Sequence, residues 1–137
     1  MGKQFAKHNA KVTIRQRKGM GIESTNDFYC DFVLSGKVGI VRVFETENVL
    51  AYHHTRPFWE THIVVVPKRH IGSLQTILPD ETELLIEIIS VVNKVAEEMV
   101  AETGAARVIT NLGKYQESKH LHFHVCSGEQ VRPDNAT

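Results

Sequence analysis

Three histidines alternate with three apolar residues near the end of the chain. The segment runs His120, Leu121, His122, Phe123, His124, Val125. In a β-strand successive side chains point to opposite faces, so this pattern predicts three imidazoles on one face and three apolar side chains on the other. The apolar face belongs to a core. Surface histidines on a polar face are one interpretation, but lysine, threonine or serine would serve there equally well, so we interpret the row as a chemical site.

Metal binding is one hypothesis for this histidine row. A His-x-His pair on a strand can hold one zinc ion, but His120 and His124 lie roughly 13 Å apart at about 3.3 Å per residue. Zn–N bonds of about 2.0–2.1 Å cannot span that gap without strong bending of the strand. Two histidines of the row with the remote His62 or His70 remain geometrically possible. No cysteine pair and no nearby aspartate completes such a site, so we predict no metal and no other cofactor.

Nucleophilic catalysis suits the row better. A neutral imidazole is a competent nucleophile toward phosphorus near pH 7, because its ordinary pKa is about 6.5. Flanking imidazoles can donate hydrogen bonds to phosphoryl oxygens and hold the central ring in one tautomer. If enough donors surround the phosphate, neither a metal nor an acid is required. The row therefore indicates phosphoryl chemistry centred on His122.

The row and several other segments resemble the histidine triad (HIT) superfamily, and most of all its Hint-like branch. The family signature is three histidines that alternate with hydrophobic residues. Leu50-Ala51-Tyr52, followed by HIVVVPKRHI at 62–71, resembles the central strands of the family and the turn after them. Asn111-Leu112-Gly113 and Gln116 stand where the family places an N-x-G and a glutamine ahead of the histidines. The resemblance covers roughly residues 28–127.

The resemblance implies a catalytic role for four histidines. In the family, the middle histidine of the row attacks the α-phosphate of a nucleotide and forms a nucleotidyl-histidine intermediate, which assigns His122 as the nucleophile. The outer histidines bind phosphate oxygens and assist the leaving group, which assigns His120 and His124. His62 matches a family histidine that lies against this cluster.

Substrate-binding positions follow from the same resemblance. Asn111 and Gln116 match residues that contact the sugar–phosphate portion or the departing group. Ser118 can replace, after a shift of one residue, a serine that often precedes the histidines. Tyr52 lies near positions that line the base pocket, with core packing as the alternative. His54 stands where Hint-like members carry a ribose-binding aspartate, and a histidine cannot mimic a bidentate carboxylate acceptor.

The resemblance implies a nucleotidyl hydrolase. It would cleave a nucleoside monophosphate from a leaving group, as in a phosphoramidate or a dinucleoside polyphosphate, by attack of His122 and then of water. A nucleotidyltransferase of the same superfamily is one alternative. A module that binds a nucleotide or a metal without turnover is another. The resemblance also implies a homodimer, because family members of the Hint and Fhit branches pair through the long helix and adjacent strands.

The elements that must position these residues are strands around one major helix. Five segments have the alternating or β-branched character of strands. They are 38–44, 49–52, 62–66, 107–110 and 120–126. The first two are expected to form a hairpin, and Pro67 ends the third because proline cannot donate to a ladder.

One long helix is predicted between the third and fourth strands. Pro79 suits its first turn, and acidic residues follow it at the positive end of the helix dipole. From Leu84 to Met99, apolar residues recur every three or four positions and form one wide stripe. Gly104 stands where a left-handed C-cap is expected. With a shorter helical segment over 72–77, these elements predict an α+β fold with a largely antiparallel sheet of about five strands, one long helix and one short helix.

Composition limits the domain count and the partners. The chain has 137 residues, of which 42% are apolar and 23% charged, so it fits a single globular domain. Residues 1–22 hold six basic residues and no acidic one, so we predict a basic N-terminal extension at 1–21 and one domain at 22–137. The extension is either solvated or lies along nucleic-acid phosphates. No apolar run approaches the roughly 20 residues of a membrane span, and we predict a cytoplasmic protein with no membrane partner.

The two cysteines are too few for a disulfide framework. They are Cys30 and Cys126, with no CxxC spacing. The cysteine pair by which some HIT members hold structural zinc is absent, so we interpret Cys30 as a small buried hydrophobe. Tyr29 and Val33 fall near base-pocket positions of the family, with core packing as the alternative.

Overall fold

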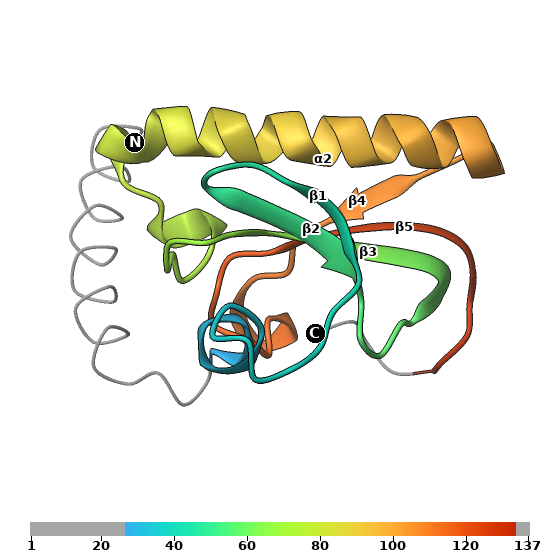
Figure 1. The fold of residues 1–137 in the computed structure, drawn as a ribbon, viewed down its shortest axis with the longest axis horizontal. Helices are drawn as coiled ribbons and strands as arrows, with labels where there is room; N and C mark the ends of the chain where they lie inside the picture. The colour runs from blue at the N-terminus through green and yellow to red at the C-terminus, as the bar shows by residue number, and fades with distance from the viewer. Residues whose placement is uncertain (1–26, 134–137) are drawn as a thin grey trace.

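An antiparallel sheet of five strands forms the centre of the computed structural model, which describes residues 27–133 (Figure 1). The strands are β1 Arg42–Glu45, β2 Val49–His53, β3 Trp59–Pro67, β4 Arg107–Ile109 and β5 Phe123–Gln130. Their order across the sheet is β1-β2-β3-β5-β4, and all neighbouring pairs are antiparallel. The predicted α+β class is confirmed. The predicted basic extension at 1–21 lies outside the described residues.

The long helix α2, Thr82–Thr103, lies along one face of the sheet (Figure 1). Its apolar stripe packs on side chains of β2, β3 and β5. The buried members of α2 are Ile88, Val91, Val92, Val95 and Met99. The helix ends as predicted, because Gly104 has a φ of 92° and its amide donates to the Val100 carbonyl at 2.8 Å. Its first predicted turn, Pro79–Glu81, is a separate 3-10 turn.

Several element boundaries differ from the predicted ones. β5 begins three residues later than expected, since the Leu121 amide donates to the Ile71 carbonyl at 2.6 Å instead of joining the ladder. β1 begins at Arg42, where the register of its pairing with β2 shifts. The predicted short helix over 72–77 is a 3-10 turn of three residues, Leu74–Thr76, which the Ser73 side chain caps.

A second apolar cluster lies on the sheet face opposite α2. A π-helical turn, Tyr29–Val33, packs there on β2 and β3 and appears in blue at the side of the sheet away from α2 (Figure 1). The buried members are Tyr29, Val33, Leu50, Tyr52, Val64 and Val66. This turn therefore covers the face that carries the histidines. Among the described residues, no helix combines the length and the apolarity that a membrane span requires.

Candidate functional site

The histidine row lies on the sheet face opposite α2, as its alternation predicts. Leu121, Phe123 and Val125 belong to the core beneath α2. His120, His122 and His124 are at most 1% exposed, and they lie beside the Tyr29 turn and His62. β5, which carries His124, is flanked by β3 and β4 on its two sides, and His120 and His122 lie in the segment that leads into it. The three imidazoles of the row have different partners, which give them different chemistry.

The ring of His122 is held in one tautomer by the backbone. Its Nδ1 lies 2.7 Å from the carbonyl oxygen of His120, and an oxygen acceptor there requires a proton on Nδ1. In the neutral ring, Nε2 then keeps its lone pair. The rings of Tyr29 and His124 each lie 4.8 Å from the His122 ring, between centroids. His122 therefore offers an oriented, neutral nucleophilic nitrogen.

His62 and His124 form a hydrogen-bonded pair with a defined direction. The Phe58 amide donates to His62 Nδ1 at 3.0 Å, so the neutral ring of His62 carries its proton on Nε2. That nitrogen lies 2.8 Å from His124 Nδ1 and donates to it. The proton of neutral His124 is then on Nε2. Burial, together with the charges of His54 and His122, lowers the pKa of His62 to about 3, which keeps the His62 ring uncharged near neutral pH.

His62 should make the unfolding free energy depend on pH. Its pKa is about 3 in the folded protein and 6.5 ordinarily, so only the unfolded chain takes up a proton as pH falls below 6.5. This contribution to stability is complete above pH 6.5 and is lost as pH falls toward 3. At pH 5 the loss amounts to about 2 kcal/mol. Urea unfolding at pH 7.5 and at pH 5 measures the drop in unfolding free energy between the two pH values. The drop should be smaller in His62→Gln than in the wild type. His53→Gln, which replaces an exposed histidine, is the control and should match the wild type. Equal losses in all three proteins would refute the prediction.

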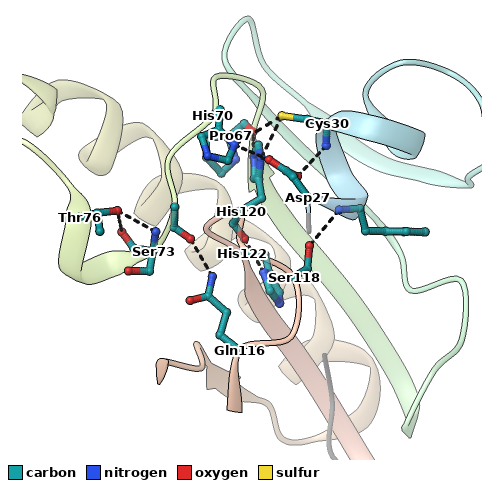
Figure 2. A network of polar contacts seen from close by, with 12 residues as sticks. Asp27, Cys30, Pro67, His70, Ser73, Thr76, Gln116, Ser118, His120 and His122 are labelled. Atoms are coloured by element: carbon teal, nitrogen blue, oxygen red, sulfur yellow. Dashed lines mark hydrogen bonds and ion pairs between the residues drawn. The ribbon is translucent and has the colours of Figure 1, made fainter. Parts of the chain in front are cut away.

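His120 faces a different set of groups (Figure 2). Its Nε2 donates to the Pro67 carbonyl at 2.7 Å. Its Nδ1 lies 3.0 Å from a carboxylate oxygen of Asp27 and 3.3 Å from the sulfur of Cys30. His70 Nδ1 contacts the same Asp27 oxygen and lies 3.7 Å from the Cys30 sulfur. These four residues, Asp27, Cys30, His70 and His120, bring together one possible metal-ligand atom each. We call them the donor cluster, in the sense of electron-pair donors to a metal.

The donor cluster corrects two sequence-based interpretations. Cys30 is not a plain buried hydrophobe, because its sulfur lies among imidazole nitrogens and it is only partly buried. Asp27 supplies the aspartate that the sequence did not reveal beside the row. The signal was the Asp-x-x-Cys spacing, since one helical turn brings residues i and i+3 together. The Cys30 amide donates to the Asp27 carboxylate at 2.8 Å and holds that turn.

The donor cluster fits a divalent metal such as zinc. One oxygen, one sulfur and two nitrogens are a ligand set that zinc accepts, and the Nε2–H bond from His120 to a carbonyl is a typical outer contact of a metal-bound histidine. Burial disfavours the charge on Asp27, but the contacts of its carboxylate with the His120 and His70 rings outweigh burial and hold the carboxyl pKa well below the usual range. Burial and the Asp27 charge raise the pKa of Cys30 to about 12, so a bound cation would have to displace the thiol proton.

A second group of histidines does not fit a metal. This group has three members, each with one ring nitrogen that lies within 4.8 Å of a ring nitrogen of the other two: His54, His62 and His124. The Arg56 amide donates to Nδ1 of His54, and the Phe58 amide donates to Nδ1 of His62, each at 3.0 Å. The neutral rings therefore carry their protons on Nε2 and act as donors there. A metal needs a lone pair, so this group suits an anion instead.

The remaining predicted site residues lie around the histidine row, and the side chains of two of them form hydrogen bonds with backbone groups. Gln116 is buried and donates from Nε2 to the Gly72 carbonyl at 2.7 Å. Ser118 is buried and accepts the Phe28 amide at 3.2 Å through Oγ, as Figure 2 shows. Asn111 is partly buried. Tyr52, 1% exposed, packs against the Tyr29 ring at 6.4 Å within the second apolar cluster.

Comparisons with known proteins agree with this fold. The HIT domain family model matches residues 35–131. An uncharacterized HIT-like protein of Helicobacter pylori is 30% identical over 100 residues, which cover 72% of this chain and 93% of that protein. The crystal structure of a HIT family hydrolase from Legionella pneumophila has a TM-score of 0.67 at 29% identity and covers 81% of this chain and 100% of that one. A zinc-bound histidine triad family protein from Mycobacterium smegmatis has a TM-score of 0.66 at 26% identity, with 81% and 86% covered.

Proposed function

Because the chain belongs to the HIT domain family, we propose that it is a nucleotidyl hydrolase in which His122 is the nucleophile. The observation that carries the proposal is the hydrogen bond from His122 Nδ1 to the His120 carbonyl at 2.7 Å. It places the ring proton on Nδ1, so Nε2 is the nitrogen whose lone pair would attack phosphorus. The substrate would be a nucleoside monophosphate joined to a leaving group, and a phosphoramidate of the Hint-like type is our first choice.

The first step would form a P–N bond between His122 Nε2 and the α-phosphorus. The bond from phosphorus to the leaving group breaks, and the leaving group keeps the electron pair and takes a proton from solvent. The His122 ring becomes positively charged, and the His120 carbonyl that already accepts its Nδ1–H stabilises that charge. Water then attacks phosphorus, the P–N bond breaks and its electron pair returns to His122 Nε2. The proton that the water loses passes to solvent, and the nucleoside monophosphate leaves neutral His122 behind.

His124 would stabilise the phosphate during both steps. The Phe58–His62–His124 chain of hydrogen bonds sets the proton of His124 on Nε2, from which it can donate to a phosphoryl oxygen or the departing atom. The donor is oriented before the substrate arrives, so no reorganisation is needed. His62 acts here as a positioning residue, because its ring contacts His124 and the Phe58 amide.

Other residues of the site would position the substrate. Gln116 and Ser118 hold the loop before the row through bonds to the Gly72 carbonyl and the Phe28 amide. Asn111 follows β4 at the edge of this loop. Tyr52 lies in the cluster beneath Tyr29, so its contribution to a base pocket would be through packing. We assign substrate contacts to Asn111, Gln116 and Ser118.

A metal in the donor cluster would have a supporting role. Asp27, Cys30, His70 and His120 would hold it, and it would supply positive charge and a cross-link between the Tyr29 turn and the row. The residues themselves already orient His122, because the His120 carbonyl accepts its Nδ1–H independently of any ligand on the His120 ring. No step of the proposed reaction passes through the metal.

Rapid-quench labelling tests the proposal. The protein is mixed with a radiolabelled nucleoside phosphoramidate and quenched in base, where a phosphohistidine-type adduct is preserved. We expect a protein-bound label that is lost in acid and that maps to the peptide with His122. Steady turnover without such an adduct at any quench time would contradict the covalent route. A nucleotide-binding module would give neither turnover nor adduct.

A homodimer and a cytoplasmic location belong to the same proposal. Exposed apolar side chains of α2, Ile86 at 60% and Val100 at 47%, together with Val108 of β4 at 48%, lie on the helix and on a strand at the edge of the sheet. Such side chains support pairing through the helix and the adjacent strand. Sedimentation of the purified protein would distinguish monomer from dimer.

A further inference from the structure

Two arginines lie next to the histidine site in a connected set of contacts. The guanidinium of Arg132 rests on the Phe58 ring, 4.6 Å from its centroid, and donates to the Arg56 carbonyl at 3.4 Å. The Phe58 ring meets the His54 ring edge to face at 5.9 Å. The Arg56 amide in turn donates to His54 Nδ1. His54, Arg56 and Arg132 thus belong to one wall beside His62 and His124.

This wall carries two guanidinium groups, those of Arg56 and Arg132, that form no ion pair with an acidic residue in the described part of the chain. His54 itself stays neutral near pH 7, because burial first, and then the charges of His122, Arg132 and Arg56, lower its pKa to about 4. Two guanidinium groups in one wall attract an anion, and arginine pairs with phosphate through two parallel hydrogen bonds.

His54 adds a hydrogen-bond donor to this wall. Its Nδ1 accepts the Arg56 amide, so its Nε2 carries the proton. The ring stacks on His62 with 4.3 Å between centroids and lies 6.0 Å from the His124 ring. The donor is therefore close to the place where the proposed function puts the reacting phosphate. A second anionic group on the same substrate could reach it.

We propose that His54, Arg56 and Arg132 form an anion subsite and that the substrate carries a second phosphate group there. The inference rests on the proposed function only for the position of the first phosphate. The second phosphate has two chemical sources: the sugar of the nucleotide or the leaving group. A second phosphate would give the two guanidinium groups an anionic partner.

Nucleotide binding tests the subsite without turnover. Titration calorimetry compares AMP with adenosine 3′,5′-bisphosphate and with ADP. We expect one of the two doubly phosphorylated ligands to bind at least about tenfold tighter than AMP, as charge-assisted hydrogen bonds allow. Preference for the 3′,5′-bisphosphate places the second phosphate on the sugar, and preference for ADP places it on the leaving side. Equal affinity for all three ligands, or binding of none, overturns the inference.

Charge-removing variants assign the effect to the wall. Arg56→Gln combined with Arg132→Gln should abolish the preference and leave AMP affinity within about threefold. Lys37→Gln combined with Arg42→Gln removes the same charge from exposed positions elsewhere and should keep the preference. An equal loss in both double variants, or a loss of AMP binding equal to that of the preferred ligand, contradicts the subsite.

The two proposals can fail separately. If the preference holds and no nucleotide substrate is turned over, the proposed function fails and the subsite stands. If a nucleotide substrate is turned over but the doubly phosphorylated ligands are not preferred, the subsite fails and the proposed function stands.

Discussion

Replacement of His122 by alanine or asparagine is expected to lower turnover at least about 10³-fold, because it removes the side chain that we propose forms the P–N bond. His122→Asn is the more informative change. Its side-chain amide can still donate to the His120 carbonyl, which now accepts His122 Nδ1, but it offers no nucleophilic lone pair. Steady-state kinetics with a fluorogenic nucleoside phosphoramidate measures the loss.

Two controls keep this experiment decisive. His53→Ala removes an exposed histidine of β2 and should keep wild-type turnover. His122 is 1% exposed, so His122→Ala leaves a cavity, and urea unfolding shows whether either His122 variant is folded. More than a few per cent of residual activity in the folded His122→Asn protein would contradict the assignment of the nucleophile.

Zinc is expected to bind the donor cluster and to stabilise the protein strongly. Binding to the folded state alone adds about 4 kcal/mol when free zinc is a thousandfold above its dissociation constant. Elemental analysis should find about one equivalent after incubation with zinc, and chelation should lower the free energy of unfolding. Cys30→Ala and His70→Ala should lose both effects, because each removes one of the four converging donors.

The second cysteine provides the matched control. Cys126 lies in β5, with its sulfur 3.8 Å from the Arg107 carbonyl and apart from the donor cluster, so Cys126→Ala should keep the metal. Asp27→Cys should bind zinc more tightly, because thiolate is a softer ligand than carboxylate. A wild-type protein that takes up no zinc and gains no stability from it would restore the sequence-based prediction of a metal-free protein.

The fold was largely predictable because its elements carry strong local periodicity. The three- and four-residue spacing of apolar residues in α2 and the two-residue alternation around His122 each admit one orientation relative to a core. The boundaries were less predictable. The Leu121 amide bonds to Ile71, a residue 50 positions earlier in the chain, and no local pattern reveals that β5 begins only at Phe123.

The site was predictable only in part. Alternation in sequence indicated that His120, His122 and His124 share a face, and they do. It did not reveal that His120 faces Asp27 and Cys30, whereas His124 faces His62. A strand pattern gives the side of the sheet on which a residue lies, but it says nothing about which distant segment packs over that side.

The sequence by itself determined the secondary elements, the sheet class and the row of imidazoles, since these depend on spacing along the chain. Only the tertiary structure decided which nitrogen of each imidazole holds the proton. That choice depends on single donors and acceptors, the Phe58 amide and the His120 and Pro67 carbonyls, which the folded backbone brings to each ring. As a result, the donor cluster is suited to a cation, whereas the neighbouring group of His54, His62 and His124 is suited to an anion.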